Sequence, residues 1–288
     1  MTYLITGATG NVGSLVVDRL IECGERPRIF VRDAQKARAR YGNRVDVFVG
    51  DLADAETLRV ALAGAEALLL LNSGPQLAER DEAAAQVAKA VRVELLVKLS
   101  SHDARVQVGT GVWHARGEAA IRRSGVPFTF VQPSGFMSNA LFWATPIKAE
   151  GVVRTCTGHG KIPFIHPQDI ADVLFRALTS GAYAAKSLPI TGPEALSYAQ
   201  MMAKIGTAIG KALRLEVISE GEERQKMVES GDSPEVVAAH LSIYRAIREG
   251  HLAAVTDTVE TVLGRNPTTF DQWVQENVTV FADPVRTV

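Results

Sequence analysis

The stretch TYLITGATGNVGSLVV at residues 2–17 decides the fold class. A short apolar run of strand type comes first, then three glycines (Gly7, Gly10 and Gly13), and then an amphipathic pattern of helix type. In such a turn the first glycine permits a sharp change of direction, the second lets the backbone approach a pyrophosphate, and the third lets the helix pack on its strand. Free N–H groups at the helix N-terminus favour the same anion. The stretch predicts a dinucleotide-binding turn, and a purely structural tight turn is the alternative.

Short β-branched or Leu-rich runs alternate with amphipathic stretches as far as residue 132, which is typical of repeated βα units. Runs such as ALLLL at residues 67–71 do not alternate, so helices are expected on both faces of the sheet. The pattern predicts an α/β fold with a Rossmann doubly wound parallel sheet. The predicted strands are 2–6, 27–31, 45–49, 66–71, 94–99 and 128–132. The predicted helices are 11–23, 34–40, 54–63, 78–91 and 111–124.

Composition and charge exclude several classes of protein. A chain of 288 residues with 47% hydrophobic residues can bury a large core, and its formal net charge of -1 provides no basic field for nucleic acid. Cys23 and Cys156 are the two cysteines, which argues against a disulfide framework or a thiolate zinc site. His159 and His166 lack partners at metal-ligand spacing. We expect no metal, no signal peptide, no membrane span and a cytoplasmic location.

The end of the second predicted strand bears on the choice of dinucleotide. Arg32 lies 19 residues beyond Gly13, where an acidic residue would bind a ribose 2′-hydroxyl and an arginine a 2′-phosphate. Together with Lys36, one helical turn later, it favours NADP(H). Asp33 could instead pair with Arg32 or serve the hydroxyl, which would favour NAD(H).

The third and fourth predicted strands also end in residues suited to this ligand. Asp51 and Leu52 follow the third strand, where adenine would lie. Asn72, Ser73 and Gly74 follow the fourth and could line the ribose side. An ordinary turn is the alternative at both places.

The chain is less regular after Pro133. We expect residues 1–150 to form an NADP(H)-binding Rossmann domain, and residues 151–288 to contain sheet-completing elements and a smaller, mostly helical C-terminal substrate lobe. The elements expected in order are a short helix near 136–143, a strand at 151–155, a strand then a helix within 161–178, a helix at 198–209 opened by a capping box of Ser197 and Gln200, a strand at 213–219, a helix from 233 to 250 and a last helix within 268–278.

Five motifs spread over nearly the whole chain resemble the atypical, NmrA-like branch of the short-chain dehydrogenase/reductase superfamily, which includes NAD(P)H:quinone reductases and triphenylmethane reductases. They are GATGNVG (7–13), FVRDAQKA (30–37), GDLADAETL (50–58), HARGEAAIRRSGVPFTFVQPSGFM (114–137) and VLGRNPTTFDQW (262–273). The resemblance implies a Rossmann domain, a preference for NADP(H), and a substrate pocket roofed by the C-terminal lobe.

The chain departs from the superfamily at its acid-base group. Ordinary members carry Tyr-x-x-x-Lys on the fifth helix, where the lysine lowers the pKa of the tyrosine. Here the resemblance places Thr110 at the tyrosine position and His114 at the lysine position. A threonine hydroxyl is too weak an acid, so we do not expect alcohol oxidation or sugar epimerisation. His114 could hold the nicotinamide ribose or donate a proton to the substrate, and a plain surface histidine is the alternative.

Other site residues follow from the same resemblance. Ser100 and Ser101 match the position of the family's catalytic serine, or else cap the next loop. The loop of residues 133–137 matches a family loop near the nicotinamide. The predicted catalytic residues are His114 and Ser100. The predicted cofactor-binding residues are Gly7, Thr9, Gly10, Asn11, Val12, Gly13, Arg32, Lys36, Asp51, Leu52, Asn72, Ser73, Gly74, Ser100, His114, Pro133 and Phe136.

Several aromatic and apolar residues could form a cavity for a planar aromatic ring, although core packing is the alternative for each. The predicted substrate-binding residues are Ser101, Trp113, Phe136, Met137 and Trp143, with Phe142 as a further candidate.

Two functions fit these features. The first is an NADPH-dependent reductase that transfers hydride to a conjugated acceptor such as a quinone, a small molecule whose own π-system takes the charge. The second is a regulatory NADP(H) sensor without turnover, for which the apolar positions Val236, Val237, Leu241 and Ile247 could meet a protein partner. A more specialised enzyme, such as an aryl-ether or enone reductase, is a further possibility. The sequence leaves monomer and homodimer open.

Overall fold

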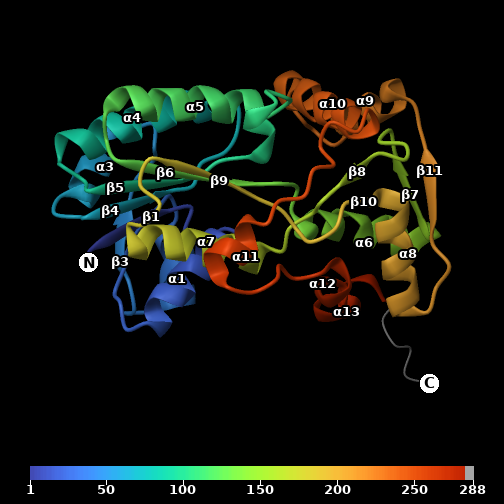
Figure 1. The fold of residues 1–288 in the computed structure, drawn as a ribbon, viewed down its shortest axis with the longest axis horizontal. Coiled ribbons are helices and arrows are strands. Elements are labelled where there is room, and N and C mark those ends of the chain that lie inside the picture. The colour runs from blue at the N-terminus through green and yellow to red at the C-terminus, as the bar shows by residue number, and fades with distance from the viewer. Residues whose placement is uncertain (283–288) are drawn as a thin grey trace.

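The apolar runs of the N-terminal half form one parallel sheet of seven strands, in the order β3-β2-β1-β4-β5-β6-β9 (Figure 1). The computed structural model describes residues 1–282. The chain adds strands outward on one side of β1 and then, from β4 onward, on the other, so the sheet is doubly wound around β1. The strands are β1 (Tyr3–Thr6), β2 (Arg28–Val31), β3 (Asp46–Val49), β4 (Ala67–Leu70), β5 (Leu95–Leu99), β6 (Phe128–Pro133) and β9 (Lys186–Ile190).

Helices cover both faces of this sheet because alternate strand residues are buried on opposite sides. In β4, Leu69 belongs to one apolar cluster and Leu68 and Leu70 to another. The first face carries α1 (Gly13–Glu22), α2 (Ala34–Tyr41) and α7 (Pro167–Ser180). The second carries α3 (Ala55–Leu62), α4 (Leu77–Ala90) and α5 (Gly111–Ser124). The predicted Rossmann α/β fold is confirmed.

Strand β9 was not predicted, although it completes the main sheet. It pairs in parallel with β6, and Gln132 lies opposite Pro189. Proline lacks the N–H that a central strand needs, so it is confined to positions such as the sheet edge. β9 is an edge strand, which is why a proline-containing run with polar Lys186 and Ser187 shows little strand pattern in the sequence.

The remaining elements form a smaller part beyond the end of the main sheet (Figure 1). Its core consists of aromatic and aliphatic side chains that are far apart in the sequence, including Phe164, Met201 and Trp273. Two short sheets accompany the helices, and the strands expected at 151–155, within 161–178 and at 213–219 lie in them. The elements are η1 (His102–Arg105), which lies at the junction, then η2 (Met137–Trp143), α6 (Ala144–Glu150), β7 (Val152–Thr155) paired with β11 (Arg214–Val217), β8 (Lys161–Ile162) paired with β10 (Leu196–Ser197), α8 (Tyr198–Ile209), α9 (Glu220–Glu229), α10 (Pro234–Arg248), α11 (Thr258–Leu263), α12 (Phe270–Glu276) and α13 (Val278–Phe281).

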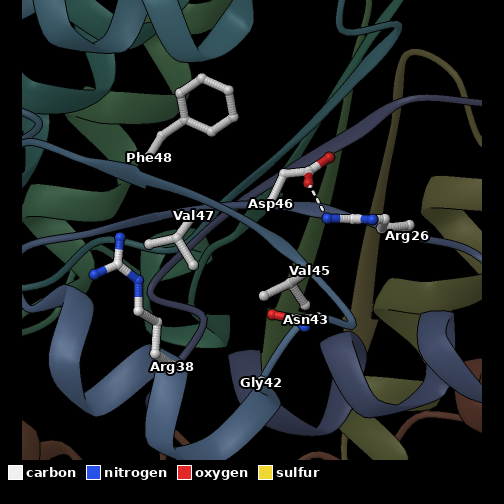
Figure 2. A pocket seen from close by; sticks show the side chains of 8 residues that line it. All are labelled: Arg26, Arg38, Gly42, Asn43, Val45, Asp46, Val47 and Phe48. Atoms are coloured by element: carbon white, nitrogen blue, oxygen red, sulfur yellow. Dashed lines mark ion pairs between the residues drawn. The ribbon is translucent and has the colours of Figure 1, made fainter.

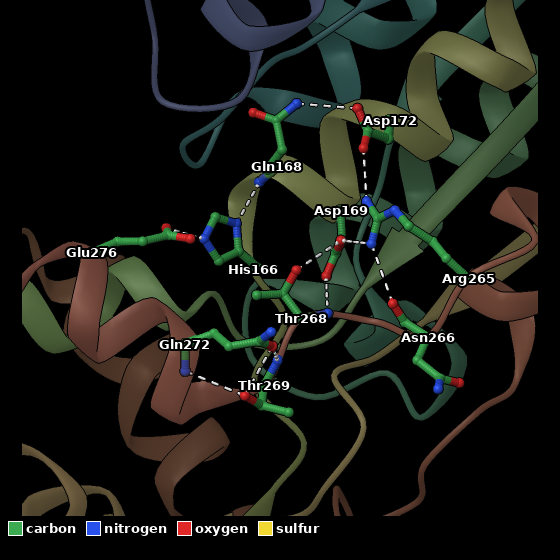
Figure 3. A network of polar contacts seen from close by, with 10 residues as sticks. All are labelled: His166, Gln168, Asp169, Asp172, Arg265, Asn266, Thr268, Thr269, Gln272 and Glu276. Atoms are coloured by element: carbon green, nitrogen blue, oxygen red, sulfur yellow. Dashed lines mark hydrogen bonds and ion pairs between the residues drawn. The ribbon is translucent and has the colours of Figure 1, made fainter.

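A polar clamp joins the C-terminal segment to the start of α7 (Figure 3). The fully buried carboxylate of Asp169 accepts hydrogen bonds from the backbone N–H of Thr268, at 2.7 Å, and from its hydroxyl, at 3.2 Å. The Arg265 guanidinium bridges Asp169 and Asp172, at 2.7 Å to each. The motif VLGRNPTTFDQW therefore fastens the lobe to the sheet, and His166 in the same network caps α7.

Among residues 1–282, no helix is long and apolar enough to cross a membrane.

Candidate functional site

The glycine turn between β1 and α1 has the geometry that its sequence predicts. Gly7 adopts φ +60°, which side chains disfavour, and a Cβ there would lie 2.9 Å from the Cβ of Leu71. A Cβ on Gly13 would overlap the carbonyl oxygen of Gly7. The glycines therefore allow α1 to begin directly against its own turn.

The N-terminus of α1 is left open to a ligand. No side chain caps it and its first turn holds no acidic residue, whereas α2 and α3 are capped by Asp33 and Asp54. Unsatisfied N–H groups at a helix start favour a phosphate. Asn11 lies in the same turn, and its side-chain amide donates to the Ser138 hydroxyl at 2.8 Å, which links the turn to η2.

A cavity of about 480 Å³ opens beside this turn, at the carboxyl ends of β1 to β4. This is the edge of a doubly wound sheet where ligands bind. Eight of the predicted cofactor residues line it: Gly7, Thr9, Arg32, Lys36, Asp51, Leu52, Asn72 and Ser73. The other residues in its lining are Thr6, Phe30, Val31, Asp33, Gly50, Leu71 and Arg80.

The charged groups of the cavity differ in whether they already have a partner within the protein. The Asp33 carboxylate accepts from the backbone N–H groups of Gln35 and Lys36, at 2.9 and 3.1 Å, as the N-cap of α2. Arg32 and Lys36 are exposed, and within residues 1–282 neither has a carboxylate at ion-pair distance. Beside the end of β2 the cavity therefore presents two cations without an ion-pair partner, Arg32 and Lys36, and one acid, Asp33, that caps the helix.

A second hollow, of about 500 Å³, lies elsewhere (Figure 2). It is lined by Gly42 and Asn43, which precede edge strand β3, and by the Arg26–Asp46 ion pair of 2.8 Å. It thus sits at the amino ends of β2 and β3, opposite the glycine turn. A ligand bound at the carboxyl ends of the strands would not contact this hollow.

The structure places Ser100 differently from the prediction. Its hydroxyl donates to Glu118 Oε1 at 2.6 Å, and the residue is 4% exposed. Gln132 donates to the same oxygen at 2.7 Å, and Arg122 donates to the other at 3.2 Å. Ser100 therefore belongs to a buried network between β5, β6 and α5, which does not support its assignment as a catalytic or cofactor-binding residue.

The half-buried side chain of His114 has an Nδ1 atom that is shut off from solvent and, among the described residues, lacks a hydrogen-bond partner. Burial, followed by the positive charge of Lys98, lowers the pKa of His114 well below its usual value. The imidazole is therefore neutral near pH 7. A buried polar atom without a partner is a place where a bound ligand can complete a hydrogen bond.

Lys98 is part of a fully buried ion pair that the sequence did not reveal. Its Nζ lies 2.5 Å from Asp81 Oδ2, and both side chains are 0% exposed. The Asn72 amide, beside the cavity, donates to the other Asp81 oxygen at 3.3 Å. A Cβ on Gly117 would overlap Asp81, so α5 approaches α4 closely at this glycine.

The turn after β5 contains Asp103, a titratable residue that was not among the predicted site residues. The Ser101 hydroxyl accepts from the backbone N–H of Asp103 at 3.1 Å and so caps η1, which was the alternative given for this serine. Burial raises the pKa of Asp103 to about 6. The neighbouring sequence, with His102 and Arg105, is that of an exposed polar turn and does not indicate such burial.

The predicted substrate residues separate into several environments. Met137 is 1% exposed within the lobe core, so it packs there rather than facing a ligand. Phe142 is 83% exposed and belongs to neither of the two cavities described above. The Trp143 ring contacts the Tyr198 ring in a tilted arrangement, with centroids 5.0 Å apart. Phe136 packs on the core of the main sheet and pairs with Ile165. Trp113 is half-buried in the first turn of α5.

Comparison with known proteins agrees with this geometry. The model of a family described as NAD(P)H-binding matches residues 7–181. The chain belongs to the NAD(P)H-binding family. The predicted resemblance to atypical, NmrA-like short-chain reductases is thereby confirmed, and the chain is an NAD(P)H-dependent oxidoreductase.

Named relatives span the whole chain. A (4-alkanoyl-5-oxo-2,5-dihydrofuran-3-yl)methyl phosphate reductase of Streptomyces griseus is 35% identical over 97% of this chain and 99% of its own. An NAD(P)H azoreductase of Xenophilus azovorans is 33% identical over 96% and 98%. The solved structure of an NADPH-dependent quinone oxidoreductase from Escherichia coli, complexed with NADPH, superposes with a TM-score of 0.87 at 26% identity over 95% of this chain and 99% of that one.

Proposed function

We propose that the protein is an NADPH-dependent reductase that transfers hydride to a small, planar, conjugated acceptor of the quinone type. The observation that carries the cofactor choice is the wall of Arg32 and Lys36, beside an Asp33 that is occupied as a helix cap. A 2′-phosphate would meet two cations there, whereas the one carboxylate on this wall already accepts two helix N–H groups through its Oδ1 atom.

The acceptor class is supported by what the site lacks. Thr110 stands where ordinary members carry the acidic tyrosine, and it begins α5 without a side-chain cap contact. A conjugated acceptor does not need that acid, because its π-system takes the hydride charge and water can supply the proton. The three relatives are named for a furanone, an azo and a quinone reaction, and each of these substrates contains a polarised multiple bond.

His114 serves in this proposal as a neutral contact to the nicotinamide ribose. Its lowered pKa leaves no proton to release near pH 7, so it is a hydrogen-bonding group rather than an acid. His114→Ala should reduce kcat/KM by about tenfold with no shift of the pH profile, and His114→Gln should recover part of the loss. Unchanged turnover of His114→Ala at every pH would remove it from the mechanism.

The sensor alternative loses its proposed partner surface. Val237, Leu241 and Ile247 are at most 2% exposed, so this stripe of α10 packs against the protein core. The experiment that separates the two functions is NADPH oxidation with a panel of quinones, enones, azo compounds and triphenylmethane dyes. We expect turnover with at least one class. Tight NADPH binding without oxidation by any member of the panel would favour the sensor.

A further inference from the structure

Arg80, on the second turn of α4, lines the same cavity as Arg32 and Lys36 but was not among the predicted residues. Its side chain is half-buried, and its Nη1 atom donates a hydrogen bond of 3.5 Å to the carbonyl oxygen of Ser73. Within the described part of the chain it has no carboxylate at ion-pair distance. A cationic side chain that lines a cavity and has no ion-pair partner is placed to contact a ligand.

The two sides of the cavity come from different layers of the fold. Arg32 and Lys36 follow β2 and belong to the start of α2, which packs on the α1 face of the sheet. Arg80 comes from α4, and Asp51 and Leu52 lead into α3, both on the opposite face. Arg80 thus lies on the wall where the base of the dinucleotide belongs, across the cavity from the phosphate-binding cations.

We propose that the Arg80 guanidinium packs flat on the adenine ring of the bound dinucleotide. This proposal rests on the proposed NADPH binding. A guanidinium is planar and weakly hydrated and stacks well on aromatic faces, whereas a lysine ammonium does not. The Ser73 carbonyl accepts a hydrogen bond from Nη1, at one edge of the guanidinium plane. Arg80 therefore stabilises the adenosine half of either cofactor. Arg32 and Lys36 discriminate NADPH from NADH, and Arg80 takes no part in that discrimination.

The test compares dissociation constants for NADPH and NADH, measured by calorimetry on the full-length protein. Arg80→Ala should weaken both cofactors by about tenfold and leave their ratio unchanged. Arg80→Lys keeps the charge but not the plane, so it should recover little of that loss. Arg224→Ala, on exposed α9 of the lobe, is the matched control and should bind both cofactors as the parent does.

Each other result overturns the proposal in a recognisable way. If Arg80→Ala weakened NADPH binding but not NADH binding, Arg80 would be a ligand of the 2′-phosphate. If Arg80→Lys restored the full affinity for both cofactors, only the charge of Arg80 would matter. Unchanged affinity in Arg80→Ala, with a parent that binds NADPH, would overturn the stacking contact and leave the proposed function standing. A parent that binds neither cofactor would overturn the proposed function as well. Circular dichroism and thermal unfolding of each variant establish that it is folded.

Discussion

The hydroxyl of Tyr41 donates a 2.6 Å hydrogen bond to the carbonyl oxygen of Ala8, inside the glycine turn. Both residues are at most 1% exposed. Burial raises the pKa of Tyr41, so the hydroxyl stays protonated and remains a donor. The last residue of α2 thus holds the glycine turn, while the first turn of the same helix carries Lys36. One short helix supports two parts of the cofactor site.

Tyr41→Phe should therefore weaken both the fold and the site. It leaves the Ala8 carbonyl buried without a partner, which should lower the free energy of unfolding by about 1–2 kcal/mol. NADPH affinity should fall by about threefold as the turn loosens. Urea unfolding and calorimetry measure the two effects. Tyr183→Phe is the control, and equal behaviour of the two variants would mean that the bond to Ala8 contributes nothing.

Gly13→Ala should prevent dinucleotide binding. The added methyl group would overlap the Gly7 carbonyl oxygen, so α1 must move away from the turn. We expect a loss of about 1–3 kcal/mol in stability and no measurable NADPH affinity. Gly221→Ala, in exposed α9, adds the same methyl with open space around it and should be neutral or slightly stabilising. A Gly13→Ala variant that binds NADPH normally would contradict the close packing of helix on turn.

The buried pair of Lys98 and Asp81 should show strong coupling in a double-mutant cycle. Lys98→Met leaves the Asp81 carboxylate buried without its cation, which should cost about 3–5 kcal/mol of unfolding free energy. The double variant Lys98→Met with Asp81→Asn removes both charges and should lose clearly less. Simple additivity of the two single changes would argue against a direct interaction.

The same double variant carries a second, spectroscopic readout. Lys98 is one of the two causes of the low pKa of His114, and burial is the larger cause. Removing the cation should therefore raise the pKa of His114 only in part, as followed by NMR of the labelled imidazole. No change in that pKa would place Lys98 outside the electrostatic environment of His114.

Asp103 should make stability depend on pH. Its pKa is raised from 3.8 to about 6 in the folded state, so the folded protein holds this proton more tightly than the unfolded chain does. The resulting stabilisation is fully present below pH 3.8 and is lost as the pH rises through about 6. After a discount for partial exposure, Asp103→Asn should be more stable than the parent by about 1–2 kcal/mol at neutral pH. The difference should vanish near pH 4, as judged by unfolding at both pH values. The same difference in unfolding free energy between variant and parent at both pH values would contradict the burial of the Asp103 carboxyl.

The fold could be predicted because its signals are local. Uniformly apolar strands such as β4, and the glycine turn itself, depend on residues within a few positions of one another. The cofactor residues at strand ends were predicted for the same reason, since parallel strands bring their carboxyl ends together. Eight of them do meet in one cavity.

The features that the sequence does not show depend on long-range packing. The sequence shows two neighbouring serines after β5, but only the fold shows that Ser100 turns towards Glu118, 18 residues away. Arg80 has no distinguishing feature in the sequence, and only the fold brings it to the cavity at the carboxyl ends of β1 to β4. Met137 and Phe142 lie on one short helix, yet one is buried and the other exposed because the lobe covers only one side.

Calorimetric titration of the protein with NADPH and NADH tests the central claim most directly. If the cations beside the capped Asp33 bind the 2′-phosphate, NADPH should bind more tightly than NADH by at least about tenfold, and Arg32→Ala should remove most of that preference. Equal affinity for the two cofactors, or no affinity for either, would contradict the account.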